Sequence, residues 1–244
     1  MADMTPETPH TVGITLVSTN EEKKRFIRFP YDHYQDDPYW VPPLVMEQKK
    51  LLNTDKNPFY DNAEIVLFLA EENGRPSGRI AAIIDHRYNE FHNTKTGFFG
   101  FFDVINSQRT TDLLFRAACD WLRDKGMKTL MGPSNPSMMD EIGILVDGFV
   151  EHPYIMMPWH KSYYNNLLSN TGLSKAIDLY AYEVDQQTVN RERMQRAVDI
   201  VTKRMPDLTI RELNLRNLKK VLSAIRHIFN EAWNNNWGFI PLRE

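Results

Sequence analysis

The chain has 244 residues, of which 42% are hydrophobic and 25% charged, the profile of an ordinary globular protein with enough length for a sizeable core. Its formal net charge of -3 gives no basic field that would attract nucleic acid or an anionic membrane. One cysteine, Cys119, excludes an intrachain disulfide framework, and no signal peptide or membrane-spanning apolar run is evident. We therefore expect a cytoplasmic protein with no nucleic-acid or membrane partner.

The first third of the chain alternates short regular elements with an aromatic segment. We expect residues 1–10 to be a disordered tail, 12–17 a strand and 21–28 a helix. The sequence FPYDHYQDDPYWVPPL follows, and its prolines exclude regular helix. Its aromatic side chains, Trp40 among them, either cover one end of the core or form a wall of a substrate pocket.

The middle of the chain predicts a meander followed by a helical crossover. Residues 44–52 read as a short helix and 87–96 as a polar loop, with Asn73-Gly74 as a hairpin turn. Three apolar runs predict antiparallel strands at 64–71, 78–85 and 98–104. A helix from Thr110 or Thr111 to Lys125 and a parallel strand at 128–131 come next. A helix at 161–170 and a closing strand at 173–184 complete this part.

The last section begins the same pattern again. A charged helix is predicted at 189–205, a strand at 208–213 and an amphipathic helix at 215–233. The strand-then-helix order repeats the opening of the first part. The apolar stripe of the last helix has no predicted sheet to cover it, so we expect self-association through this helix.

The order of these elements resembles the GNAT acetyltransferase fold. The amino-acid sequence of several segments resembles a bacterial family of tandem GNAT-like proteins. The resemblance is carried by GRIAAIIDHRYNEFHNTKTGFFGFFDV, DWLRDKGMKTLMGPSNPSMMDEIGILVDGF, HPYIMMPWHKSYYNNLLSNTGLSKAIDLYAYE and FNEAWNNNWGF. It implies an α/β fold with a mixed, largely antiparallel sheet and flanking helices. It implies a GNAT-like domain at 11–185, then, at 186–244, a linker helix and the opening strand and helix of an incomplete second GNAT-like domain.

The resemblance implies acetyl-CoA or another acyl-CoA as cofactor, but two of the family's features are absent here. In GNAT proteins a glycine-rich turn holds the coenzyme A pyrophosphate, and the corresponding positions, Ser107, Gln108, Arg109 and Thr110, include no glycine. These four residues are still the predicted cofactor-binding residues, because Arg109 supplies charge and the helix N-terminus is retained for an anion. Leu168 stands where the family's general-acid tyrosine is expected. In the tandem family the cofactor signature belongs to the second domain.

The loop after the crossover strand, 132–141, is the candidate substrate site, because α/β proteins place ligands at such loops. Asn135, Ser137 and Asp140 offer hydrogen-bonding groups, with the alternative that they only satisfy loop backbone. Glu141 precedes an apolar strand and is the predicted catalytic base.

Trp40, Trp159 and His160 complete the predicted substrate site, His160 with the alternative of hydrogen-bonding near the following helix. His152 and His160 lack the spacing of metal ligands, so no metal is expected.

Two functions follow from these observations. The first is an N-acyltransferase-related protein that transfers an acyl group from acyl-CoA when complete, with this portion shaping the pocket for a small-molecule acceptor. The second is a ligand-binding or scaffolding module, built on a GNAT fold that has lost its catalytic activity. The resemblance favours the first, and the glycine-free turn with Leu168 favours the second.

Overall fold

The computed structural model describes residues 11–185, 189–209 and 215–243 and divides the chain into two compact units. Unit 1 extends to Ser174 and includes the later segment Asn236–Ile240, and unit 2 comprises Lys175–Asn235 and Pro241–Glu244. The predicted tail 1–10 lies outside the described residues. Each unit is considered by itself.

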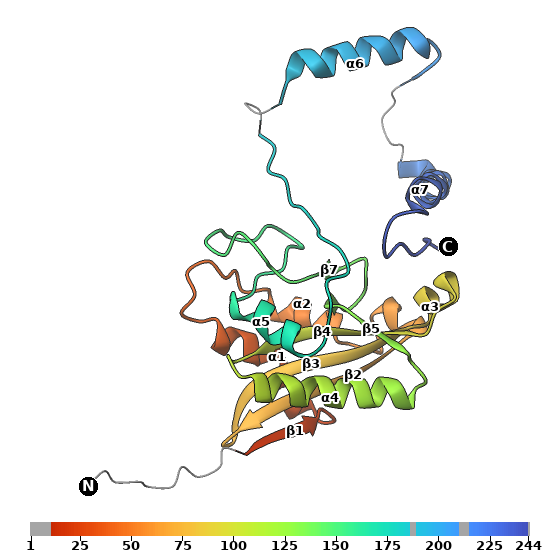
Figure 1. Cartoon of the computed structure of the whole chain (residues 1–244). Helices are drawn as coiled ribbons and strands as arrows, with labels where there is room; N and C mark the ends of the chain where they lie inside the picture. The colour runs from red at the N-terminus through yellow and green to blue at the C-terminus, as the bar shows by residue number, and fades with distance from the viewer. Residues whose placement is uncertain (1–10, 186–188, 210–214, 244) are drawn as a thin grey trace, which may run out of the picture. The chain divides into compact units, whose positions relative to one another are not determined.

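Unit 1 is built on a five-stranded sheet in which sequence order equals spatial order (Figure 1). The strands are β1 (Val12–Leu16), β2 (Ala63–Glu72), β3 (Arg75–Asp85), β4 (Thr96–Val104) and β5 (Thr129–Met131). Neighbours pair antiparallel except β4 and β5, which are parallel because the crossover helix α4 separates them. The predicted fold class, an α/β protein with a largely antiparallel sheet and flanking helices, is confirmed.

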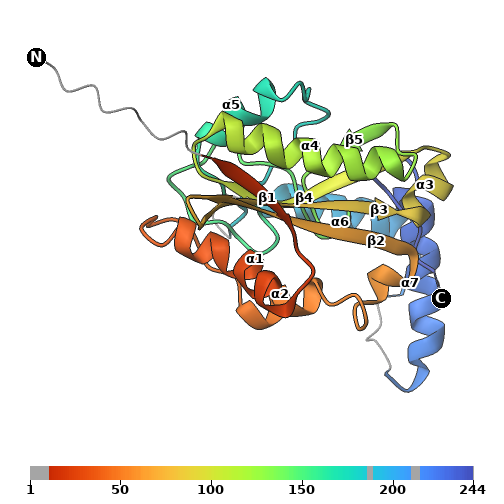
Figure 2. The same cartoon turned by 90° about the horizontal axis from the view of Figure 1, so that it is seen from below.

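Helices cover both faces of this sheet. They are α1 (Asn20–His33), α2 (Val45–Leu51), the 3₁₀ turn η1 (Pro58–Asn62), α3 (His86–His92), α4 (Gln108–Asp124) and α5 (Tyr163–Asn170). Figure 2 shows α4 and α5 on one side of the sheet and α1 and α2 on the other. Two buried clusters match these layers, one around Leu114 and Tyr164, the other around Phe26 and Leu52.

Helix α1 continues through Pro30, so the prediction that this aromatic segment excludes helix was wrong for residues 29–33. A proline inside a helix leaves the carbonyl four residues earlier without its usual donor. Here that carbonyl belongs to Phe26, and it accepts a hydrogen bond of 3.0 Å from the guanidinium of Arg79. A tertiary contact thus replaces the lost helical bond, which sequence rules on proline do not foresee.

Two further predictions are corrected. The expected polar loop at 87–96 contains α3, because the carboxylate of Asp85 accepts from the backbone N–H of Tyr88 and caps a short helix. The expected closing strand at 173–184 is irregular backbone, with Tyr180 and Tyr182 exposed. In the part of the chain that the structure describes, no strand pairs with this segment, and a strand without a neighbour leaves its backbone groups unpaired.

Strand β4 carries a bulge that shapes the centre of unit 1. Pairing with β3 shifts register between Arg79 and Ala81, and Phe101 has φ +46°. Just before the bulge, Gly100 lies beneath the short strand β6 (Ser134–Asn135), which pairs with β7 (Glu141–Ile142). A β-carbon at Gly100 would lie 1.7 Å from the carbonyl oxygen of Ser134, so only glycine permits this approach.

Unit 2 contains two helices whose apolar side chains are exposed. They are α6 (Arg191–Arg204) and α7 (Leu218–Trp233), the latter preceded by the 3₁₀ turn η2 (Leu215–Asn217). Most of the strand predicted at 208–213 lies outside the described residues. Leu222 and Ile228 of α7 are exposed, and self-association through this helix stays a prediction. No described helix has the length and apolar character needed to cross a bilayer.

The segment Asn236–Ile240 packs into unit 1. Phe239 and Ile240 are buried, and Ile240 joins the core cluster around Phe98. The backbone carbonyl of Phe239 lies 2.9 Å from Nε2 of His92, and the rings of Phe91 and Phe239 are 5.7 Å apart. The segment Lys175–Asn235 of unit 2 is therefore an insertion that is connected to unit 1 at both of its ends.

Candidate functional site

A cavity of about 150 Å³, here called the Glu141 pocket, opens beside the bulge of β4. Its walls come from five parts of unit 1: the end of α1 and the loop after it, helix α2, strands β3 and β4, the β6–β7 hairpin, and the loop before α5. The side chains that line it include Tyr34, Trp40, Arg79, Asp103, Asn135, Glu141, Trp159 and His160. Predicted site residues from distant parts of the sequence thus share one cavity.

Glu141 is held in this pocket by Asn135. The amide nitrogen of Asn135 donates to Oε1 of Glu141 at 2.8 Å, and its carbonyl oxygen accepts from the backbone N–H of Phe101 at 2.5 Å. Burial raises the pKa of Glu141, and the charge of Asp103 adds to this, while the bond from Asn135 opposes it. A carboxylate with a raised pKa is a stronger base than an ordinary glutamate.

A buried ion pair forms the floor of the pocket. Arg79 and Asp103 are cross-strand neighbours in β3 and β4, and Nε of Arg79 donates to the Asp103 carboxylate at 2.7 Å. The Tyr34 hydroxyl lies 2.8 Å from both Asp103 and the Tyr164 hydroxyl, which accepts from the backbone N–H of Val104. Burial would raise the pKa of Asp103, but Arg79 and Tyr34 hold it below its ordinary value. Arg79 and Asp103 are therefore hydrogen-bonded within the protein, and the pair forms a rigid floor of the pocket.

Trp159 lines the pocket and carries a buried donor that has no partner among the described residues. Its side chain is 9% exposed, and its indole Nε1 has no hydrogen-bond partner among the described residues. A buried N–H without an acceptor costs free energy.

His160 is neutral at pH 7, since burial lowers its pKa to about 4 against the opposing charge of Asp103. Its Nδ1 accepts from the backbone N–H of Leu145 at 3.4 Å, which assigns the ring proton to Nε2.

Two buried histidines predict that unit 1 loses stability in weak acid. The pKa of His33, like that of His160, is lowered to about 4 by burial. Below about pH 6.5 the unfolded chain binds protons that the folded chain does not, so the free energy of unfolding falls by a few kcal/mol as pH drops to about 4. Glu141, with its raised pKa, contributes with the opposite sign. The melting temperature measured from pH 7 to 4 should fall, and less steeply for His160→Gln. Equal slopes would contradict this account.

Two of the predicted substrate residues lie outside the pocket. The Ser137 hydroxyl donates to Asp140 at 2.6 Å and accepts from the backbone N–H of Met139 at 3.1 Å. These bonds close the turn between β6 and β7. Ser137 and Asp140 therefore fit the structural alternative of satisfying the loop, and they set the hairpin that presents Asn135 and Glu141.

The turn before α4 does not fit a coenzyme A pyrophosphate. The Ser107 hydroxyl caps the helix by accepting from the backbone N–H of Thr110, and Thr110 is fully buried. The Gln108 side chain reaches across to α5 and donates to the carbonyl of Leu167 at 3.1 Å. Arg109 is exposed. The turn is filled by its own side chains where a phosphate would need bare backbone.

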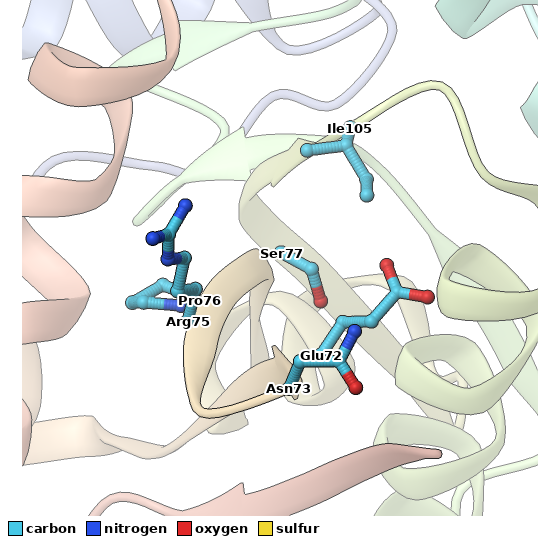
Figure 3. A pocket seen from close by; sticks show the side chains of 6 residues that line it. All are labelled: Glu72, Asn73, Arg75, Pro76, Ser77 and Ile105. Carbon is cyan, nitrogen blue, oxygen red and sulfur yellow. The ribbon is translucent and has the colours of Figure 1, made fainter. Parts of the chain in front are cut away.

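A larger, open hollow of about 520 Å³ lies at the β2–β3 turn and shares no residue with the Glu141 pocket. Figure 3 shows its lining side chains, among them the buried Ser77, whose hydroxyl has no hydrogen-bond partner in the described structure. We place the site at the Glu141 pocket instead, because it gathers the buried Arg79–Asp103 pair with the predicted residues Asn135 and Glu141. Over the described ranges no cluster of three His, Cys, Asp or Glu side chains is arranged to hold a metal ion.

The Arg79–Asp103 ion pair and the tyrosines bonded around it, Tyr34 and Tyr164, were not predicted as site residues from the sequence. Arg79 and Asp103 stand in apolar strands, and a charged residue inside such a run is the signal that could have identified them. Tyr164 precedes by one turn the Leu168 position, which is packed in the core. Its hydroxyl reaches β4, a contact that no local pattern encodes.

Comparisons with known proteins give two relatives. No protein-family model matches the chain. The chain is 37% identical over 235 residues to the "Bacterial ceramide synthase" of Caulobacter vibrioides, covering 96% of this chain and 60% of that protein. It is 35% identical over 231 residues to "Protein YghO" of Escherichia coli, covering 94% of this chain and 58% of that protein. The chain thus spans about three fifths of the length of these relatives.

Among solved structures, similarity is weaker. An aminoglycoside acetyltransferase from an uncultured soil metagenomic sample has a TM-score of 0.42 at 14% identity, covering 71% of this chain and 97% of that one. A tandem GNAT protein from the clavulanic acid biosynthesis pathway has a TM-score of 0.43 at 12% identity, covering 66% and 43%.

Proposed function

We propose that this chain binds the acceptor of an N-acyltransferase, an amine attached to a hydrocarbon chain, in the Glu141 pocket. The observation that carries the proposal is a buried carboxylate of raised pKa that lines one pocket with the aromatic side chains of Trp40 and Trp159. The pocket is small, about 150 Å³, which fits a head group and leaves a longer chain outside. The relative named as a ceramide synthase supports an amine acceptor, because a ceramide is an amide of a long-chain amino alcohol.

The roles of the residues follow from their chemistry. Glu141 accepts a proton from the acceptor's ammonium group, which leaves the neutral amine with a free lone pair as the nucleophile. Asn135 positions the carboxylate through its hydrogen bond to Oε1 of Glu141. The walls formed by Tyr34, Trp40 and Trp159 exclude water from the amine.

The acyl donor is assigned to another part of the whole protein. The filled turn at Ser107–Thr110 does not fit coenzyme A. The resemblance to tandem GNAT proteins implies that acetyl-CoA or another acyl-CoA is held by a second domain.

Amine binding tests the proposal. Octylamine titrated into the chain at pH 7.5 should quench tryptophan fluorescence, because Trp40 and Trp159 line the pocket. Octanol should bind at least tenfold more weakly, since it lacks the charge that pairs with Glu141. Glu141→Gln should weaken octylamine binding at least tenfold, and octylamine affinity of the unmodified chain should fall in acid as Glu141 takes up a proton.

The matched control is Glu151→Gln, because Glu151 is exposed on the loop before α5. Its octylamine affinity should equal that of the unmodified chain. Equal octylamine and octanol affinities, or a Glu141→Gln variant that binds octylamine normally, would overturn the proposal.

The filled turn also supports a second candidate function, a module that binds its ligand without catalysis. Thiol release from acetyl-CoA or a longer acyl-CoA, measured with octylamine present, separates the two. Amine binding without thiol release indicates that this chain alone is a binding module. Release that depends on Glu141 indicates that it holds the complete chemistry.

A further inference from the structure

Two uncharged stretches flank the mouth of the Glu141 pocket. One is VPPLVM at 41–46, which leads into α2, and the other is PYIMMPW at 153–159, in the loop before α5. Exposed aliphatic side chains project from both stretches and from Val150 close by; Leu44 is 61% exposed and Ile155 94%. We call this set the apolar rim: Val41, Leu44, Met46, Val150, Ile155 and Met156.

The apolar rim is continuous with the pocket. Val41 and Pro43 of the first stretch, and Pro153 and Met157 of the second, line the cavity itself. The two stretches are joined where Nδ1 of His152 lies 3.1 Å from the carbonyl oxygen of Tyr39, their rings 5.7 Å apart. The rim is therefore one surface around one opening, within unit 1.

The first stretch is also fixed to the body of unit 1. The Tyr31 hydroxyl of α1 donates to the carbonyl oxygen of Pro43 at 2.6 Å, and the Trp40 ring packs edge-on against that of Tyr31 at 5.6 Å. Leu44 and Met46 thus project from an anchored backbone.

The shape and charge of the rim select its partner. Apart from Val41, which also lines the cavity, its side chains stand out singly, as the 94% exposure of Ile155 shows. A protein partner would need a matching hollow for each, whereas fluid hydrocarbon accepts a protruding side chain of any shape. The neighbouring charges are of both signs, with Lys49 and Lys50 on α2 and Asp147 and Glu151 on the other loop, so no lipid charge is favoured.

We infer that the apolar rim docks this chain onto a lipid surface, with the Glu141 pocket opening toward the head groups. This goes beyond the expectation of no membrane partner, which rested on net charge and the lack of a spanning segment. The docking stands on the rim alone. Where the proposed function also holds, a lipid amine reaches Glu141 while its hydrocarbon chain stays in the surface.

Flotation of the full chain with phosphatidylcholine vesicles tests the inference. The double variant Leu44→Ser/Ile155→Ser should reduce the partition coefficient at least tenfold. Its control, Leu222→Ser/Ile228→Ser, removes two exposed apolar side chains of α7 and should leave binding unchanged. Raising the salt to 0.5 M should also leave it unchanged, because attraction between charges is not involved.

Three outcomes would overturn the docking: vesicle binding equal in the rim variant and the unmodified chain, binding lost only in the α7 variant, or a rim variant that changes the oligomeric state of a chain that does not bind vesicles. The last would identify a second copy as the partner. Glu141→Gln should still bind vesicles, so a failure of the proposed amine site is seen separately from a failure of the docking.

Discussion

Replacing Asp103 by asparagine should lower the free energy of unfolding of unit 1 by about 3–5 kcal/mol. Asparagine keeps the shape and an acceptor for Tyr34, but it leaves the charge of Arg79 buried without a counter-ion; the side chains of Arg79 and Asp103 are 7% and 10% exposed. The guanidinium also supports the Phe26 carbonyl at the proline in α1, so the loss should spread from β4 to that helix. Hydrogen exchange of β3 and β4 amides measures this loss of unfolding free energy within unit 1.

The control for Asp103 is Asp32→Asn. Asp32 pairs with Arg28 on the exposed surface of α1, where such a pair contributes about 0–1 kcal/mol. Asp103 should also lose its stabilising effect in acid: with its pKa lowered, the contribution is present above about pH 4 and disappears as pH falls through the folded-state pKa. An Asp103→Asn variant as stable as Asp32→Asn would refute the buried pair.

Gly100→Ala should destabilise unit 1 by about 3 kcal/mol and abolish octylamine binding. The added β-carbon would lie 1.7 Å from the carbonyl oxygen of Ser134, which is backbone and has no rotamer to yield. The β6–β7 hairpin must move away from β4, and with it the Asn135 amide that links Phe101 to Glu141. Urea unfolding and the octylamine titration measure the two effects.

Gly13→Ala is the matched substitution in a strand. A β-carbon at Gly13 meets no atom within 4 Å, so this variant should keep both its stability and its amine binding. If Gly100→Ala retained amine binding, the close approach of β6 to β4 would not be what positions Glu141.

Much of the fold was predictable because its signals are local. Apolar runs gave β2, β3 and β4, the Asn73-Gly74 turn joined the first two, and the spacing of Leu114 and Ala118 gave α4. The continuation of α1 through Pro30 was not predictable, because its compensation comes from Arg79, about fifty residues away. Apolar and polar side chains alternate at 173–184 as they do in a strand. The backbone groups of a strand also need a neighbouring strand to pair with, and alternation cannot provide one.

The site was predictable only in part. Glu141 and Asn135 were selected because polar residues follow a crossover strand, and Trp40 and Trp159 because they are aromatic. The structure adds what joins them: a bulge at Phe101 whose N–H meets Asn135. Ser137 and Asp140, chosen on the same grounds, bond to each other instead. Composition cannot distinguish a polar side chain that faces a cavity from one that closes a turn.

The burial of Phe239 and Ile240 in unit 1 makes unit 2 a doubly tethered insertion. For such a segment, lengthening costs little, about 0.6 kcal/mol for each doubling of the loop, so variation in the helices between the tethers need not disturb the sheet. A cut is different. Proteolysis between the two tethers would turn the return of Ile240 to its place beside Phe98 from an intramolecular step into one that depends on concentration. The burial of Phe239 and Ile240 thus decides whether a nicked chain stays in one piece.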